Sequence, residues 1–144
     1  MTTRCFWFFL IVCIAMVFSG SAVEAQQVNV SIAVIKASNS GNGIDENIKH
    51  LQPKLSRLNY ASYTLLKQDA QRGELHTELI FDLPDGDTMR IKPIGIESGY
   101  LKLFVAMDKA GLKTNFKIAN GNTIIVGGSA YQDGSMVIAL SADY

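Results

Sequence analysis

Residues 28–35 read VNVSIAVI, and this stretch sets the structural class of the whole chain. Because alternate side chains of an extended strand point to the same face, apolar residues at every second position indicate a strand with one buried face. Here those residues are Val28, Val30, Ile32 and Val34. The same alternation recurs in segments 75–83, 101–107, 112–118 and 136–142. The sequence therefore predicts a protein built mainly from strands.

Turn signals separate these segments at regular intervals. Asn-Gly and Asp-Gly pairs favour tight hairpin turns, because both central residues of a type I′ turn need positive φ. We expect an antiparallel meander or sandwich of about eight strands, with one buried face in each sheet. The expected turns are Arg72-Gly73, Asp85-Gly86, Glu97-Ser98-Gly99, Lys109-Ala110-Gly111, Asn120-Gly121 and Asp133-Gly134.

Residues 44–58 carry the one helical pattern. Their apolar positions are spaced by four and three residues, which places them on a single helical stripe: Ile44, Ile48, Leu51, Leu55 and Leu58. Pro53 is unfavourable inside a helix, so we expect a kink there or two short helices that meet at Gln52. The fold class is therefore α+β, with one N-terminal amphipathic helix covering one face or end of the sheet structure.

The first 25 residues have the organisation of a secretory signal peptide. Arg4 is the only charge before Glu24, fourteen apolar residues follow from Cys5 to Phe18, and small residues precede Ala25. The apolar run is shorter than the roughly 20 residues that span a bilayer. We expect cleavage after Ala25, with an uncleaved membrane anchor as the alternative. Residues 26–144 then form a single α+β domain, periplasmic or secreted, whose only membrane contact is through the signal peptide before cleavage.

Composition narrows the classes of function. The chain has 13 basic and 13 acidic residues, a formal net charge of +0. This balance argues against a nucleic-acid binder or a polybasic membrane binder, since both need excess Lys and Arg. Both cysteines lie in the signal peptide, so the processed domain has no disulfide and no thiol. An exported domain without Cys fits a bacterial envelope better than a eukaryotic secretory route.

The two histidines give no clear catalytic pattern. His50 lies in the helical region, and His76 is expected on a polar strand face between Glu74 and Glu78. Alternate strand residues do align, but zinc sites usually contain more nitrogen or sulfur ligands. A solvated strand face is the simpler interpretation. If the protein were an enzyme, Glu74, His76 and Glu78 would be the best candidates for its site. We expect no catalytic residues, no metal and no cofactor, and therefore a protein that is not an enzyme.

Two loops could hold ions but have simpler explanations. Residues 82–87 gather three carboxylates around a glycine, as weak calcium sites do, although Pro84-Asp85-Gly86 is also a favourable tight turn. Residues 38–43 contain glycine before the expected helix, but they lack the ending of a phosphate-binding loop. Turn and loop are the preferred interpretations.

Tyr60 and Tyr63 are the candidate ligand-binding residues. Tyrosine buries its ring while its hydroxyl needs a polar partner, so the pair could line a groove between helix and sheet. Packing at the edge of the core, beside the helix, is the alternative interpretation.

Two stretches carry resemblances. The order of signal peptide, strand, ASNSGNGID loop (37–45), Leu-patterned helix, LPDG (83–86) and GGSAYQDGSMVIALSA (127–142) is similar to small exported bacterial domains of unknown function. Residues 114–128, TNFKIANGNTIIVGG, resemble a hairpin of bacterial secretins, the outer-membrane pores of secretion and pilus systems. The second resemblance implies a secretin-like sheet or an accessory subunit of an envelope assembly.

Together these observations predict an exported, non-enzymatic interaction or assembly module of the bacterial envelope, of the secretin-accessory kind. Its partner would be an envelope protein, such as a secretin or a pilus-type assembly, which could add a strand to a free sheet edge. The alternative is a small-ligand-binding domain with a pocket between helix and sheet, near Tyr60 and Tyr63.

The export prediction has a direct test. Because cleavage is expected after Ala25, N-terminal sequencing of the protein recovered from its host should begin at Gln26. Recovery of the intact precursor from the inner membrane would contradict the signal-peptide prediction.

Overall fold

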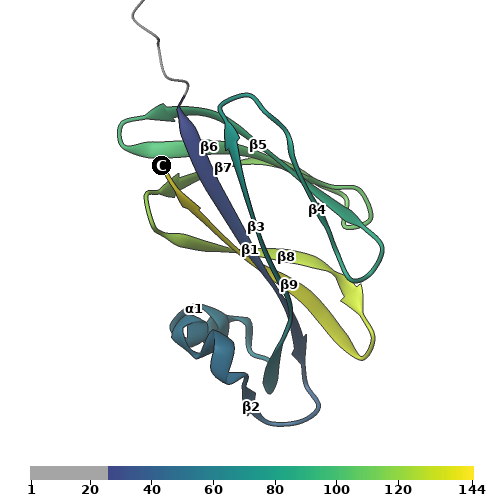
Figure 1. Cartoon of the computed structure of the whole chain (residues 1–144). Helices are drawn as coiled ribbons and strands as arrows, with labels where there is room; N and C mark the ends of the chain where they lie inside the picture. The colour runs from purple at the N-terminus through teal and green to yellow at the C-terminus, as the bar shows by residue number, and fades with distance from the viewer. Residues whose placement is uncertain (1–25) are drawn as a thin grey trace, which may run out of the picture.

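The computed structural model describes residues 26–144, so the predicted signal peptide lies outside the described residues. These residues form nine strands in two sheets and one short helical segment, a β-rich α+β fold with a sandwich-like arrangement (Figure 1). None of the described helices is both long and apolar enough to cross a membrane.

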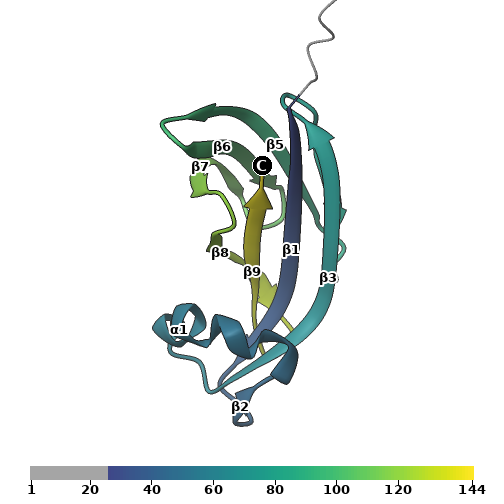
Figure 2. The same ribbon diagram turned by 60° about the vertical axis from the view of Figure 1, so that its left-hand side comes forward.

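The five-stranded sheet brings distant parts of the chain together. Its order is β2-β3-β1-β9-β8, and its pairs are antiparallel except for the short β2–β3 pair. The beginning of β1 and the end of β9 lie at one end of the molecule, and the helical segment lies at the other (Figure 2). The strands are β1 (Gln27–Ser38), β2 (Gly43–Ile44), β3 (Ser62–Glu74), β8 (Thr123–Tyr131) and β9 (Gly134–Asp143).

The four-stranded sheet is a simple meander in the order β4-β5-β6-β7. The predicted meander therefore describes this sheet, whereas the five-stranded sheet pairs strands that are far apart in sequence. The turns at Asp85-Gly86, Ser98-Gly99 and Gly111 join its hairpins as predicted. The strands are β4 (Leu79–Asp82), β5 (Thr88–Glu97), β6 (Tyr100–Met107) and β7 (Leu112–Ala119).

The main core lies between the two sheets. The predicted alternation is confirmed in β1, where every second residue from Val28 to Val34 is buried against the four-stranded sheet. Burial of this apolar surface is the largest favourable contribution to folding, at about 25 cal/mol per Å². The largest buried partners include Phe81, Met89, Ile91, Leu101, Leu103, Ile118, Met136 and Ile138.

The helical segment covers the opposite face of the five-stranded sheet at one end. Ile48, Leu51 and Leu55 are buried there against Ile35 and Val137, which form a second, smaller core. The segment is a 3₁₀ turn η1 (Glu46–Leu51), an α-helical turn α1 (Gln52–Leu55) and a 3₁₀ turn η2 (Ser56–Leu58). The predicted junction at Gln52 is therefore observed.

The predicted five-residue stripe needs a correction at both ends. Ile44 lies in β2 rather than in the helix, and Leu58 is 37% exposed. Asp45 caps the segment by accepting a hydrogen bond from the amide of Asn47 (3.1 Å), so the helix begins after Ile44. Pro53 lies in the first turn of α1, where its missing amide proton costs little, and the helical segment ends at Asn59, whose backbone is left-handed (φ 59°).

The turn predicted at Arg72-Gly73 is wrong. Gly73 lies inside β3 and pairs with Val28, and the chain turns later, around Leu75 and His76. A Cβ on Gly73 would lie 2.8 Å from Cδ2 of Leu79, so this glycine allows a close approach where the chain crosses between sheets. Its φ does not lie in the left-handed region, whereas that of His76 is 70°.

The hairpin predicted at Asn120-Gly121 is also wrong. β7 pairs with β6 and β8 pairs with β9, so the segment that resembles a secretin hairpin is divided between the two sheets. Asn120 holds this crossing, because its side-chain amide makes two hydrogen bonds with the backbone of Tyr144 (2.9 and 3.0 Å). The Tyr144 hydroxyl donates to the carbonyl oxygen of Gly99 (2.7 Å) and so joins the end of β9 to the other sheet.

Gly134 provides a test of the central pairing. The turn expected at Asp133-Gly134 is formed by Gln132 and Asp133, and Gly134 begins β9 against the backbone of Ala37. A Cβ on Gly134 would collide with the Ala37 carbonyl oxygen, so Gly134→Ala should lower the free energy of unfolding by about 3 kcal/mol.

Gly95→Ala is the matched control, because a Cβ at Gly95 meets nothing within 4 Å. Urea denaturation of both variants measures the difference. Equal midpoints for the two variants would contradict the close packing of β1 against β9.

Candidate binding site

Two of the grooves beside the helical segment are formed with strands β1, β3, β8 and β9, because that segment covers only one end of the outer face of the five-stranded sheet. One groove lies on the sheet face between the segment and the exposed part of β1, β3 and β9. The other lies between the segment and β8, and we call it the β8 groove. Thr123, the first residue of β8, lines both grooves.

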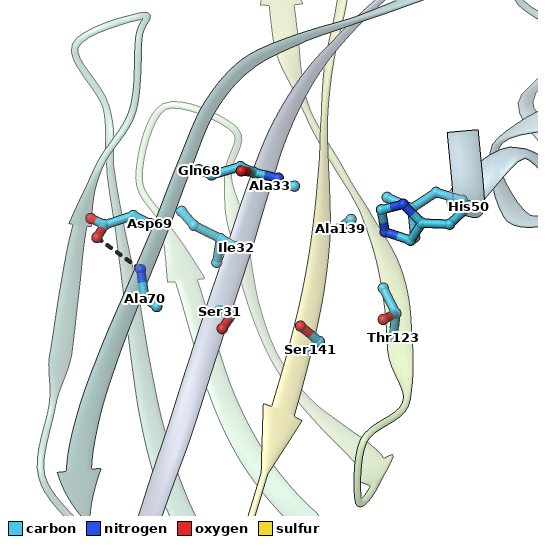
Figure 3. Close-up of a pocket in the computed structure, with 11 residues that line it drawn as sticks. Ser31, Ile32, Ala33, His50, Gln68, Asp69, Ala70, Thr123, Ala139 and Ser141 are labelled. Carbon is cyan, nitrogen blue, oxygen red and sulfur yellow. Dashed lines mark hydrogen bonds between the residues drawn. The ribbon is translucent and has the colours of Figure 1, made fainter. Parts of the chain in front are cut away.

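The groove on the sheet face has a volume of about 410 Å³ and a floor of small side chains. Figure 3 shows His50 extending from the helical segment over Ala139 and Thr123. Asp69 is turned to the far side of β3, where it accepts a hydrogen bond from the amide of Ala70 (2.8 Å). The groove therefore presents hydroxyls, an amide and one imidazole on a shallow surface, rather than a paired acid and base.

The β8 groove is larger, about 790 Å³, and its floor is apolar. Its wall on the helical side is open to solvent, since Arg57 and Leu58 are exposed. The residues that line it are Pro53, Lys54, Arg57, Leu58, Tyr60, Thr123, Ile124, Ile125, Gly127, Gly128, Ser135, Met136 and Val137.

The β8 groove runs along the edge of the sheet. Ile124 packs against the main core and Ile125 against the smaller one, yet both line the groove, so it passes over the edge of the strand. β8 pairs with β9 alone. Its pairing is irregular between Gly127 and Ala130, where a Cβ on Gly128 would lie 2.8 Å from the carbonyl oxygen of Met136.

Lys54 shows which peptide groups of β8 face the groove. Its Nζ donates to the carbonyl oxygen of Thr123 and to Oδ1 of Asn122 (3.1 Å). Peptide groups two residues apart in a strand point to the same edge, so those of Ile125 and Gly127 face the groove as well. Within residues 26–144, no hydrogen bond reaches these two peptide groups from outside the sheet.

The electrostatic character of the β8 groove is positive. Lys54 and Arg57 are its only charged lining residues, and neither forms an ion pair within the part of the chain that the structure describes. A ligand of this groove would therefore be favoured if it carried negative charge.

The structure places the two candidate tyrosines together but in different surroundings. Their ring centroids are 6.3 Å apart, with an interplanar angle of 82°. Tyr60 lines the β8 groove and donates to Oγ of Ser135 (3.1 Å). Tyr63 is 7% exposed, and its hydroxyl donates to the carbonyl oxygen of Leu55 (2.6 Å). Tyr60 is therefore accessible to a ligand, and Tyr63 holds the helical segment.

The carboxylates of residues 82–87 stabilise a tight turn and a contact between the sheets. Asp85 accepts hydrogen bonds from the Ser129 hydroxyl (2.7 Å) and the Asp87 amide (2.9 Å). The buried Asp87 accepts from the amides of Thr88 and Lys109. Burial alone would raise the pKa of Asp85, but these hydrogen bonds and the charge of Lys109 together lower it.

The predicted alignment of Glu74, His76 and Glu78 on one strand face is wrong. β3 ends at Glu74 and β4 begins at Leu79, so the residues between them form a crossing in which His76 has left-handed backbone geometry. Among the described residues, no group of three or more His, Cys, Asp or Glu side chains could hold a metal ion.

A polar cluster closes the end of the molecule near Tyr60. Lys36 on β1 forms an ion pair with Asp133 (2.7 Å), and Ser40 donates a hydrogen bond to the same carboxylate (2.6 Å). The hydrogen bonds from Lys36 and Ser40 hold the pKa of Asp133 well below its ordinary value. The loop 38–43 thus binds the β8–β9 turn through its serine hydroxyls.

Comparison of the chain with protein-family models, with curated proteins and with solved structures finds no match. The functional conclusion therefore depends on the geometry of the grooves and of the surface.

Sequence reasoning found Tyr60 but missed the position of β8 at the edge of the five-stranded sheet and the basic wall of its groove. Gly127-Gly128 was a usable signal, because paired glycines within a strand pattern indicate a bulge or a close backbone approach. Arg57 gave no signal, since a single exposed charge beside an apolar stripe is common on any surface helix.

The polar cluster predicts a specific titration. Because the pKa of Asp133 is lowered in the folded state, its carboxylate should stay ionised at pH values below the ordinary Asp pKa of about 3.9. The stability from this contact is present above that ordinary value and is lost as pH falls through the lower, folded-state pKa. Carboxyl ¹³C NMR measures the titration.

Lys36→Met keeps the aliphatic stem and removes the charge, so it should move the Asp133 titration upward. An Asp133 titration that is the same in both proteins would contradict the ion pair.

Proposed function

We propose that this protein is a non-enzymatic interaction module of the bacterial envelope, exported to the periplasm or beyond, that binds an extended segment of a partner protein along β8. One observation carries the proposal: a free strand edge and a helical segment form the two walls of one groove. An extended peptide in such a groove gains main-chain hydrogen bonds from the edge and side-chain contacts from the floor.

The groove has the parts that strand addition needs. The peptide groups of Ile125 and Gly127 face it, and Tyr60 and Val137 supply an apolar floor between β8 and the helical segment. Lys54 already occupies the Thr123 carbonyl, so a bound segment would pair from Ile125 onward. Arg57 on the opposite wall favours a segment that carries acidic residues.

The partner would be an envelope protein. A secretin or a pilus-type assembly is the class that the sequence resemblance suggests. The resembling segment is divided between the two sheets, and only its β8 part lines the groove.

A small ligand in the same groove is the second candidate function. Tyr60, Ile125 and Val137 could contact an apolar molecule, and the Tyr60 hydroxyl could accept a hydrogen bond from it. The two candidates differ in their effect on the backbone, because a small apolar ligand leaves the β8 edge unpaired.

Peptide titration tests the proposal. The sample is the protein in the processed form that its host produces. Extended peptides about as long as β8, which has nine residues, would be titrated into it in acidic, neutral and basic versions. The acidic peptides should bind best, and they should slow amide hydrogen exchange at Ile125 and Gly127. Arg57→Glu should weaken their binding about fivefold or more, equivalent to about 1 kcal/mol.

Arg72→Glu is the matched control, because Arg72 is an exposed residue on β3 outside the groove, and it should leave binding unchanged. Gly127→Pro provides a second control on mechanism, since proline is tolerated on edge strands yet removes the amide that would pair with the peptide. Peptide binding that is unchanged in both Arg57→Glu and Gly127→Pro would exclude strand addition at β8. Hydrogen-exchange changes confined to Tyr60 and Val137 would favour the small ligand.

A further inference from the structure

The outer face of the four-stranded sheet concentrates positive charge. In β6, Leu101, Leu103, Val105 and Met107 face the core, so the alternate residues face outward. β5 and β7 alternate in the same way. The outward-facing basic residues of the three strands form what we call the basic face: Arg90, Lys92, Lys102, Lys113 and Lys117. The chain has 13 basic residues, and all except Arg4 lie in residues 26–144. The basic face therefore holds five of these twelve.

Strand register brings these cations close together. Lys102 lies directly opposite Lys117, and Arg90 and Lys113 both lie opposite Ala106 in one row across three strands. Like charges directly opposite each other in a sheet are destabilising, so this pairing does not serve the fold. It increases the attraction for an external anion instead.

Few carboxylates offset the basic face. Asp108 pairs with Arg90 (3.0 Å), while Asp82 and Glu97 lie at the ends of their strands. Within residues 26–144, the four lysines of the basic face form no ion pair. Although the formal net charge of the chain is zero, its charges are not evenly distributed, because basic residues gather on this face.

The basic face has apolar side chains at its margins. None of its five residues lines the groove on the sheet face or the β8 groove. Ile80 on β4 is 52% exposed and Tyr100 at the start of β6 is 50% exposed, whereas Phe104 in the middle is partly buried. The helical segment covers the other sheet, and no element formed by residues 26–144 covers this face (Figures 1 and 2).

We propose that the basic face docks the protein on an anionic phospholipid surface. Lysine is a compact point charge suited to a plane of phosphate groups, and an interfacial tyrosine and isoleucine can enter the headgroup region. A single-stranded nucleic acid would need exposed aromatic rings in the middle of the sheet, but Phe104 is partly buried. The proposal is independent of the β8 groove, which belongs to the other sheet.

Vesicle binding tests this proposal with the protein as its host processes it. It should sediment with phosphatidylcholine vesicles that contain about 30% phosphatidylglycerol and not with pure phosphatidylcholine vesicles. Binding should fall steeply as salt rises from about 0.05 to about 0.5 M, because counterions screen the charges. Each neutralised lysine should lower the partition coefficient about fivefold, so Lys102→Gln with Lys117→Gln should lower it about 25-fold.

Lys49→Gln with Arg72→Gln is the matched control, because both residues are exposed and lie outside the basic face. This control should stay within about twofold of the parent protein. An equal loss in both double variants would assign the effect to net charge and overturn the proposal. Absence of anionic-vesicle binding, or tighter binding to a single-stranded oligonucleotide through Lys102 and Lys117, would overturn it as well.

Discussion

Where the second half of β1 lies beside the first half of β9, both faces of the pair are covered, and the rest of the structure is arranged around this pair. Residues Met136 to Leu140 are all buried, although successive side chains of a strand point to opposite faces. Such burial requires an apolar layer on each side. The four-stranded sheet supplies one layer, and the helical segment supplies the other.

The helical segment is too short to cover the whole outer face of the five-stranded sheet, and the grooves form where it ends. A segment of isolated 3₁₀ and α-helical turns has little stability of its own, so tertiary contacts must hold it in place. Tyr63 holds it through the carbonyl of Leu55, and Lys54 holds it through the edge of β8. The contacts that fasten the segment thus also define the wall of the β8 groove.

The two proposed surfaces belong to different sheets. The β8 groove lies at an edge of the five-stranded sheet, while the lysines gather on the outer face of the four-stranded one. A protein that docks through the second face can leave the first free for a partner segment. Such a division of roles suits an assembly module that acts next to a membrane, and each surface can be tested without the other.

Sequence alone determined strands β1, β6, β7 and β9 and the position of the helical segment, whereas the alternating residues 75–83 include a crossing before the short β4. The alternation from Val28 to Val34 depends only on local backbone geometry, and so does the break at Pro53. Strand partners were decided by the tertiary structure, because period-two alternation does not say which edge a strand will meet. For that reason Gly73 and Asn120-Gly121 resembled hairpin turns, although both accompany crossings between sheets. The β8 groove was likewise decided by the tertiary structure, since Arg57 and Gly127 line one groove only after distant segments have packed. Lys102 and Lys117 instead face each other across a single hairpin, so the register of that hairpin brings them together.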